Sequence, residues 1–333
     1  MTNLKLPRRQ FLHLAATAAA IPAASRITQA QTYPSRPITI VVGLAAGGPT
    51  DVGARLLAER LTPLLGQPVI IENVVGASGS IGLGRVVRAA SDGYTLSVGD
   101  LTTHVTNQVT FSLAYDLRTD LQPIALLRTN SPLIVARNGV PGGNLKELVA
   151  WLFANPDKAS VGTGGVGSTA HIAGLIFQKI TGVRVQFIPY RGEAPAIQDL
   201  LAGRVDMTFG TPMGTLPFIQ AGQLRAYAIM AKSRLAILRD LPTVDEAGVP
   251  GAYFSNWLSL WAPKGTPRDI IATLNTAVVA ALADPAFKER FADKVGSAVA
   301  PLDFQSPEGL ARFHKAEIDK WFPIFKELNI KAE

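Results

Sequence analysis

The feature that most constrains this chain is a repeated order of β-branched run, glycine loop and helical pattern. Residues 37–42 (PITIVV) form a β-branched run, and residues 45–51 follow as a loop with two adjacent glycines. Apolar residues then recur at helical spacing between residues 52 and 65. This order predicts a strand, a loop and a helix. Residues 68–71, 73–80 and 81–90 repeat it, before a third strand at 94–98.

The middle of the chain follows the same alternation. Further strands are predicted at residues 133–136, 159–161, 183–188, 205–209 and 224–230, and helices at residues 145–154, 170–180 and 195–202. Strands that alternate with helices of about ten residues are typical of βαβ units. We therefore predict the α/β class, with mainly parallel sheets and helices on both faces.

The count of strand and helix units predicts two similar halves, yet no long Gly/Ser-rich or charged linker separates them. This layout is expected if the chain crosses between domains twice, near residues 126–133 and 227–232. We predict a discontinuous first domain, residues 31–130 plus 232–333, and a second domain, residues 131–231. Helical patterns at residues 270–282, 285–294 and 307–328 would close over the first domain.

The first thirty residues have the layout of an export signal. Basic residues precede an apolar run from Leu14 to Ala24, and no Asp or Glu occurs before residue 31. The run is too short to span a bilayer, which disfavours the alternative of a membrane anchor. Residues 7–13 (PRRQFLH) resemble a twin-arginine signal, with an ordinary secretory signal as the alternative. We predict cleavage after Ala30, with small residues at the −3 and −1 positions.

Charge and cysteine content exclude several function classes. Removal of the signal takes away four basic residues and lowers the formal net charge from +7 to +3. The remainder contains no basic run or basic stripe with interleaved aromatics, so we expect no nucleic-acid partner. The absence of cysteine excludes disulfides, cysteine zinc sites, iron–sulfur clusters and cysteine nucleophiles. It does not identify the compartment.

Glycine loops before helices are candidate anion sites. A helix N-terminus presents free N–H groups and the positive end of its dipole, and glycine lets a ligand approach the backbone. The alternative is that Thr50 or Asp51 only caps its helix. The pattern recurs at residues 76–79 and 162–169, which favours a shared ligand site at the carboxyl ends of parallel strands.

More specific motifs are weak or absent. Residues 165–170 have dinucleotide-fingerprint spacing, but the preceding strand is short, and no Walker sequence occurs. His104, His171 and His314 remain after the signal, without metal-ligand spacing. An exported hydrolase that uses Ser168 or Ser78 with His171 stays an alternative. Residues 190–195 turn into a helix, where Arg191 would either meet a ligand carboxylate or be exposed.

The mature chain resembles the periplasmic solute-binding proteins of tripartite tricarboxylate transporters, also called Bug receptors. The resemblance extends over essentially its full length. The matching segments are residues 33–38 (YPSRPI), 46–51 (AGGPTD), 72–82 (ENVVGASGSIG), 91–96, 114–121, 189–196 (PYRGEAPA), 203–206, 241–248 and 261–267. Family members often have Ser or Ala where this chain has residues 163–165, and residues 101–104 differ from the usual small-residue segment.

The resemblance implies a two-domain periplasmic binding protein of the type II-like fold that closes over a small carboxylate in a ligand cleft between the domains. Backbone amides and ordered waters would hold the carboxylate at the loops near residues 47–51, 73–80 and 163–169. We expect a monomer with membrane transporter subunits as partners and with no catalysis, cofactor or metal. A solute sensor for a signalling receptor is a further alternative. The candidate ligand-binding residues are Gly47, Gly48, Thr50, Asp51, Asn73, Ser78, Gly79, Thr102, Thr163, Gly164, Gly167, Ser168, Thr169, His171, Arg191 and Gly192.

Overall fold

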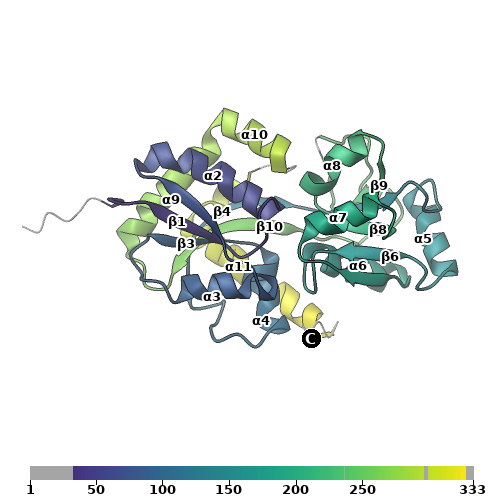
Figure 1. Cartoon of the computed structure of the whole chain (residues 1–333), viewed down its shortest axis with the longest axis horizontal. Helices are drawn as coiled ribbons and strands as arrows, with labels where there is room; N and C mark the ends of the chain where they lie inside the picture. Colours follow the sequence, from purple (N-terminus) through teal and green to yellow (C-terminus); the bar gives the residue numbers. More distant parts are fainter. Residues whose placement is uncertain (1–32, 236, 296–298, 328–333) are drawn as a thin grey trace, which may run out of the picture.

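The computed structural model describes residues 33–235, 237–295 and 299–327, so the predicted signal and its cleavage site lie outside the described residues. The described chain forms two five-stranded sheets, placed side by side along the long axis of the molecule, with helices packed on them (Figure 1). The α/β class predicted from the alternation of strands and helices is confirmed.

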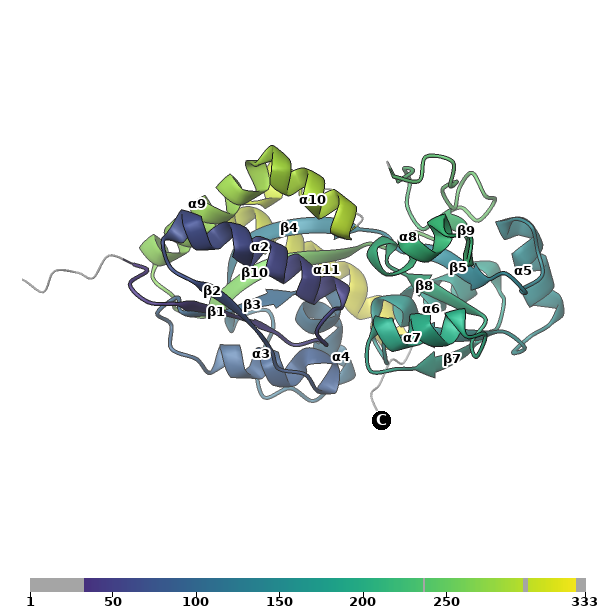
Figure 2. The same cartoon turned by 45° about the horizontal axis from the view of Figure 1, so that its top comes forward.

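The first sheet has the strand order β2-β1-β3-β10-β4. Its strands are β1 (Ile38–Val42), β2 (Val69–Asn73), β3 (Thr95–Gly99), β4 (Leu121–Asn130) and β10 (Asn256–Pro263). Its helices are α2 (Pro49–Leu65), α3 (Ser80–Val87), α4 (Asn107–Thr110), α9 (Arg268–Ala283), α10 (Pro285–Val295) and α11 (Pro307–Glu327). Figure 2 shows α2, α9 and α10 along one face of this sheet and α3 and α4 at the other.

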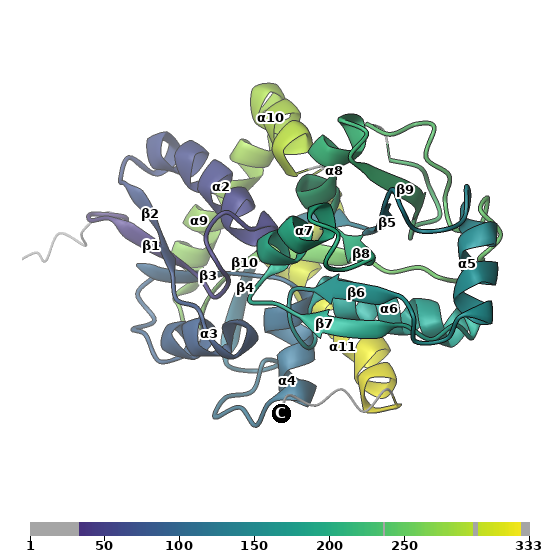
Figure 3. The ribbon, with the colours of Figure 1, turned by 45° about the vertical axis from the view of Figure 1, so that its right-hand side comes forward.

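The second sheet has the strand order β7-β6-β8-β5-β9. Its strands are β5 (Leu133–Arg137), β6 (Ser160–Thr163), β7 (Gln186–Pro189), β8 (Met207–Gly210) and β9 (Leu224–Ile229). Its helices are α5 (Leu145–Ala154), α6 (Thr169–Thr181), α7 (Glu193–Leu201) and α8 (Pro212–Gln220). Figure 3 shows α7 and α8 on one side of this sheet and α6 on the other. Alternate residues of β5 face these two sides: Ile134 packs in the cluster with α6, and Leu133 packs with residues of α7 and α8.

The expectation of mainly parallel sheets holds for only part of each sheet. The pairs β1–β2, β1–β3, β6–β7 and β6–β8 are parallel, as glycine loops followed by helices require. The pairs β3–β10, β4–β10, β5–β8 and β5–β9 are antiparallel. Both sheets are therefore mixed. The reason is that β4, β5, β9 and β10 flank the passages of the chain between the sheets: β10 lies between β3 and β4, β5 lies between β8 and β9, and each runs antiparallel to both neighbours.

The chain passes between the sheets by a short and a long connection. Only Ser131 and Pro132 separate β4 from β5, and residues 230–255 lead from β9 to β10. The prediction included no strand at β10 and placed only a crossing where β4 ends. The division into two domains at residues 130 and 231 stays a prediction.

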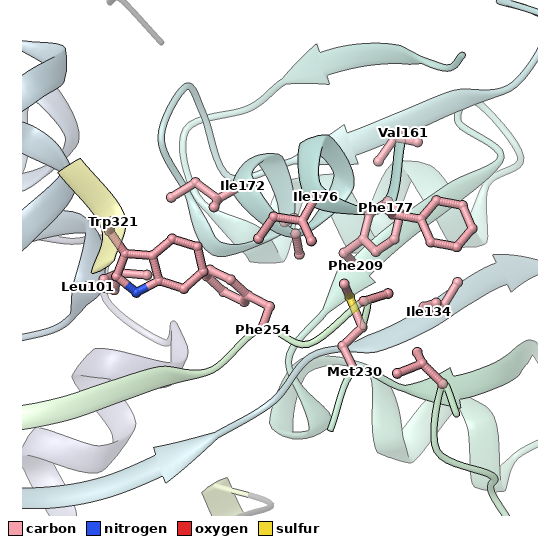
Figure 4. Close-up of a cluster of buried hydrophobic side chains, with 14 of the residues drawn as sticks. Leu101, Ile134, Val161, Ile172, Ile176, Phe177, Phe209, Met230, Phe254 and Trp321 are labelled. Carbon is pink, nitrogen blue, oxygen red and sulfur yellow. The ribbon is translucent and has the colours of Figure 1, made fainter. Parts of the chain in front are cut away.

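Two clusters of buried apolar side chains pack against the first sheet, and one of them continues to the second sheet. Ile40, Leu57 and Leu274 belong to the cluster between the first sheet and α2 and α9. The other cluster joins Leu101 and Trp321 of the first-sheet side to Ile172 of α6 (Figure 4). No single helix within the described residues is long and apolar enough to span a membrane. Helix α9 and the start of α10, which are bent by 74° relative to each other, together have the length and composition of a span.

Candidate functional site

Three loops follow parallel strands and lead into helices, as the sequence pattern predicts. We name them loop A (residues 43–48, between β1 and α2), loop B (residues 74–79, between β2 and α3) and loop C (residues 164–168, between β6 and α6). Loops A and B belong to the first sheet, and loop C belongs to the second. The carboxyl ends of parallel strands meet at one edge of a sheet, so these loops gather the polar groups of each half.

Loop A presents an uncapped helix. Gly48 occupies the N-cap of α2 without a side-chain cap, and Pro49 fills the first turn. Within the described residues, the amides of Thr50 and Asp51 have no hydrogen-bond acceptor. Gly47 has a φ of 79°, in the left-handed region that glycine adopts without strain. The start of α2 therefore offers two N–H groups and its dipole to an anion or water.

Asp51 and Asn73 hold loop A in place through the protein's own groups. The Asp51 carboxylate, 2% exposed, accepts hydrogen bonds from Gly47 N (2.9 Å), Arg55 Nε (2.9 Å) and Asn73 Nδ2 (2.9 Å). Asn73 Nδ2 also donates to the Leu44 carbonyl at 3.0 Å. Burial alone would raise the pKa of Asp51, but these hydrogen bonds and the Arg55 charge lower it below 3.8. Both residues therefore position the loop.

Loop B is a left-handed run that packs closely on its neighbours. Ala77 and Ser78 have φ values of 45° and 50°, which are uncommon for residues with a Cβ. Gly79 has a φ of 93°, and an added Cβ there would lie 2.5 Å from Thr103 Cγ2. The Ser78 carbonyl accepts a hydrogen bond from Asn107 Nδ2 at 2.9 Å. This conformation brings the Ser78 hydroxyl to loop C.

Loop C ends in a capped helix. Ser168 is the N-cap of α6, and its hydroxyl oxygen accepts from the His171 amide at 3.4 Å. The His171 ring accepts from the Gly167 amide through Nδ1 at 3.0 Å. Burial lowers the pKa of His171 from 6.5 to about 4, so the ring is neutral at pH 7. Among the described residues, neither Ser78 nor Ser168 bonds this ring, so the geometry does not support the hydrolase alternative.

Loop C touches the first-sheet side at several points. Ser78 Oγ donates to the Val166 carbonyl at 3.4 Å, and Thr102 Oγ1 donates to the Gly167 carbonyl at 3.3 Å. Asn256 Nδ2 of β10 donates to Thr169 Oγ1 at 2.8 Å. Gly167 has a φ of 76°, and a Cβ added there would lie 3.0 Å from Thr106 Cγ2. The structure thus brings together the predicted residues Ser78, Thr102, Gly167 and Thr169.

The remaining predicted residues surround these contacts to different degrees. Thr163 is buried, and its Oγ1 accepts from the Gly165 amide at 3.4 Å. Gly164 lies against the residues that open α7, since an added Cβ would sit 3.3 Å from Glu193 N. A Cβ on Gly192 would lie 3.8 Å from Ala45 Cβ of loop A. Arg191 is exposed and forms no ion pair within the described part of the chain.

The sequence-based prediction missed three charged residues near these loops: Asp100 and Arg128, which are buried, and Glu193, which is half-buried. Asp100, at the end of β3, accepts from Thr50 Oγ1 (3.2 Å), Thr103 N (3.0 Å) and Thr103 Oγ1 (3.0 Å). Glu193, at the start of α7, accepts from Thr211 N (2.6 Å) and Thr211 Oγ1 (2.9 Å). Burial raises the pKa of both carboxyls.

The third missed residue is Arg128 of β4, which is 1% exposed. Burial lowers its pKa to about 10, and both Asp100 and Glu193 act electrostatically against that shift. An arginine inside an apolar stretch (ALLRTN) is the one sequence signal that could have directed attention to it.

Comparisons with known proteins identify the family and the fold of the chain. The family model of the tripartite tricarboxylate transporter family receptor matches residues 53–330. This chain belongs to that receptor family. A UPF0065 protein from the TAR-I ttuE-ttuC′ intergenic region of Agrobacterium vitis is 36% identical to the receptor over 319 residues, which cover 96% of this chain and 91% of the relative.

Solved structures share the receptor's fold over most of its length. The periplasmic binding protein BugD has a TM-score of 0.83 at 38% identity, with 90% of this chain and 100% of that chain covered. MatC from Rhodopseudomonas palustris, solved with bound malate, has a TM-score of 0.81 at 37% identity, with coverage of 87% and 98%. An R. palustris protein solved with adipate has a TM-score of 0.85 at 33% identity, with coverage of 90% and 100%. The two-sheet fold of the receptor is therefore that of periplasmic binding proteins.

Proposed function

We propose that this receptor captures a small organic carboxylate in the periplasm and delivers it to a membrane transporter of the tripartite tricarboxylate type. The observation that carries the proposal is the contact of loop B with loop C between the two sheets, with loop A, whose Gly43 lies against Gly79 of loop B, and the unpaired amides at the start of α2 beside it. A carboxylate needs convergent N–H and O–H donors, which these loops supply. The relatives solved with malate and adipate support the same ligand class.

Capture in this proposal occurs by closure of residues 131–231 against residues 31–130 plus 232–333. The contacts of Gly167 with Thr102 and of Thr169 with Asn256 then belong to the closed form. The connections at residues 131–132 and 230–255 serve as the hinges, since they join the two sheets. The receptor acts as a monomer, exported and cut after Ala30, and performs no chemistry on its ligand.

A thermal-shift screen of the mature chain against mono- and dicarboxylates, including aromatic ones, tests the proposal. A ligand at one hundred times its Kd stabilises the folded state by about 2.7 kcal/mol. We therefore expect at least one acid to raise Tm by several degrees, with no turnover of an ester substrate. The proposal is refuted if no carboxylate raises Tm and none gives heat in titration calorimetry.

A matched pair of glycine variants locates the site. Gly47 and Gly66 lie at opposite ends of α2, both with positive φ and with no atom within 4 Å of an added Cβ. Gly47→Ala and Gly66→Ala therefore impose the same backbone strain, about 1–2 kcal/mol each. We expect both to lower Tm similarly, and only Gly47→Ala to weaken ligand binding. Equal ligand affinity of both variants would show that loop A does not contribute to the ligand site.

A further inference from the structure

Arg128 is a buried cation whose donors are unused. It projects from the last third of β4, and its Nε and Nη1 atoms have no hydrogen-bond partner in the described part of the chain. Buried polar groups in native proteins are almost always bonded to protein, water or a ligand. An arginine with two open N–H positions therefore indicates a group that fills them when the receptor is loaded.

The neighbouring carboxylates balance the charge of Arg128 without binding its guanidinium. Asp100 and Glu193 interact with it electrostatically, but neither bonds its Nε or Nη1 atom. Each carboxylate is already bonded by threonines, Asp100 by Thr50 and Thr103, and Glu193 by Thr211. The N–H groups of Arg128 thus remain open between one carboxylate of the first sheet and one of the second.

The surroundings of β4 place these open donors next to the loops. Asn130 lies two residues after Arg128 on the same face of β4, and its Oδ1 is also buried and without a partner. Asn256 of β10 pairs with Asn130 across the sheet and donates to Thr169 at the start of α6. Leu258, which pairs with Arg128 across β10, packs in the cluster with α2 and α9, and its Cδ2 would lie 2.7 Å from a Cβ added at Gly53 of α2. The face of β4 that carries Arg128 is therefore covered by α2, the helix that follows loop A, and its Asn130 end lies beside Asn256, which bonds α6.

We propose that Arg128 is a specificity-determining residue that binds a second carboxylate of the ligand while loops A to C hold the first. The inference rests on the proposed function and narrows it to dicarboxylates. A planar guanidinium matches carboxylate oxygens in geometry and in charge, and it keeps its proton after burial. Asn130 Oδ1 would then accept a hydrogen bond from a hydroxyl or amine next to that second carboxylate.

Matched ligand pairs test this inference by calorimetry on the mature chain. Succinate, glutarate and adipate are each compared with their monoamides, which keep the length but lose one charge. Removal of one partner of a buried charged pair generally costs roughly 30-fold or more in affinity. We expect wild type to prefer a diacid over its monoamide by about that factor, and Arg128→Gln to abolish the preference.

Arg137→Gln is the control, because Arg137 of β5, the next strand along the chain, is paired with Asp206 at 2.7 Å and lies outside the loops. It should retain the full preference. If the glutamine variant does not fold, Arg128→Lys keeps the charge but loses the planar donors, and the preference should fall about tenfold.

The outcomes separate the two proposals. A diacid preference that survives Arg128→Gln, or that is undiminished in Arg128→Lys, overturns the inference, because a water molecule would then occupy the open donors. Equal binding of diacids and monoamides by wild type overturns the inference and leaves the carboxylate receptor intact. If no carboxylate binds, the proposed function and the inference fail together.

Discussion

Gly167 of loop C offers the sharpest test of the contact between the two sheets. Its φ of 76° is costly for alanine, about 1–2 kcal/mol, and an added Cβ would lie only 3.0 Å from Thr106 Cγ2 on the first-sheet side. Gly182, at the other end of α6, has a φ of 73° but a nearest contact of 3.8 Å, to Phe153 Cε2. Gly167→Ala therefore carries the same backbone strain as Gly182→Ala and an additional crowding between the sheets.

We expect both variants to lose a few degrees of Tm, at roughly 2–4 °C per kcal/mol for a chain of this size. Ligand affinity should fall about tenfold in Gly167→Ala, which corresponds to about 1.4 kcal/mol lost from the closed form, and should stay unchanged in Gly182→Ala. Denaturation melts and titration calorimetry on both proteins measure the two quantities. Equal affinity in the two variants would show that the contact between loop C and Thr106 does not contribute to binding.

Three further predictions follow from the hydrogen bonds of the site. Asp51→Asn should destabilise the fold by about 1–3 kcal/mol at pH 7. Because folding lowers the pKa of Asp51, the stability of wild type over this variant should be lost as pH falls below 3.8, as measured by Tm at a series of pH values. Because burial lowers the pKa of His171 from 6.5 to about 4, the folded wild type should lose up to about 3 kcal/mol of stability as pH falls through this range. His171→Asn keeps an acceptor for Gly167 N but has no titrating ring, so it should not show this loss. Parallel curves of stability against pH for the two proteins would contradict the burial of His171. Thr102→Val deletes the hydroxyl that donates to Gly167 O and should weaken binding several-fold, whereas Thr110→Val, which deletes a bond to Thr106 O within one helix, should not; identical Kd values would count against the role of Thr102.

Much of the fold follows from local pattern. The strands around β1 and β6 and the helices α2, α5 and α6 were predicted because apolar periodicity and glycine punctuation are local properties. Strand β10 was missed, although all of its residues are buried. A continuous buried run with Trp257 and Trp261 carries no alternation, so periodicity alone does not identify it as a strand. The antiparallel pairs depend on the connections between sheets, which the local pattern does not encode.

The sequence predicts which loops form the candidate site, but it does not predict which atoms each side chain of these loops bonds. Glycine loops before helices indicated where donors would gather, and Ser78, Thr102, Gly167 and Thr169 do meet in the structure. The carboxylate of Asp51, a predicted ligand-binding residue, holds loop A in position through Gly47 and Asn73, and its contact with a ligand stays a prediction. That role depends on Asn73, which is 22 residues away in the chain. Arg128 gave no local signal of its neighbours, because Asp100 and Glu193 come from different sheets.

The apolar cluster shared by both sheets has a consequence for exchanging parts between relatives. Phe254 and Trp321 meet edge to face at 5.2 Å, and the same cluster includes Ile172 of α6 (Figure 4). A chimera that takes residues 131–231 from another receptor would therefore join two surfaces shaped by different neighbours. Volume mismatches of even one methylene are felt in such interiors. Phe254 and Trp321 lie outside residues 131–231, so a unit of exchange that keeps this cluster together is larger than the second sheet.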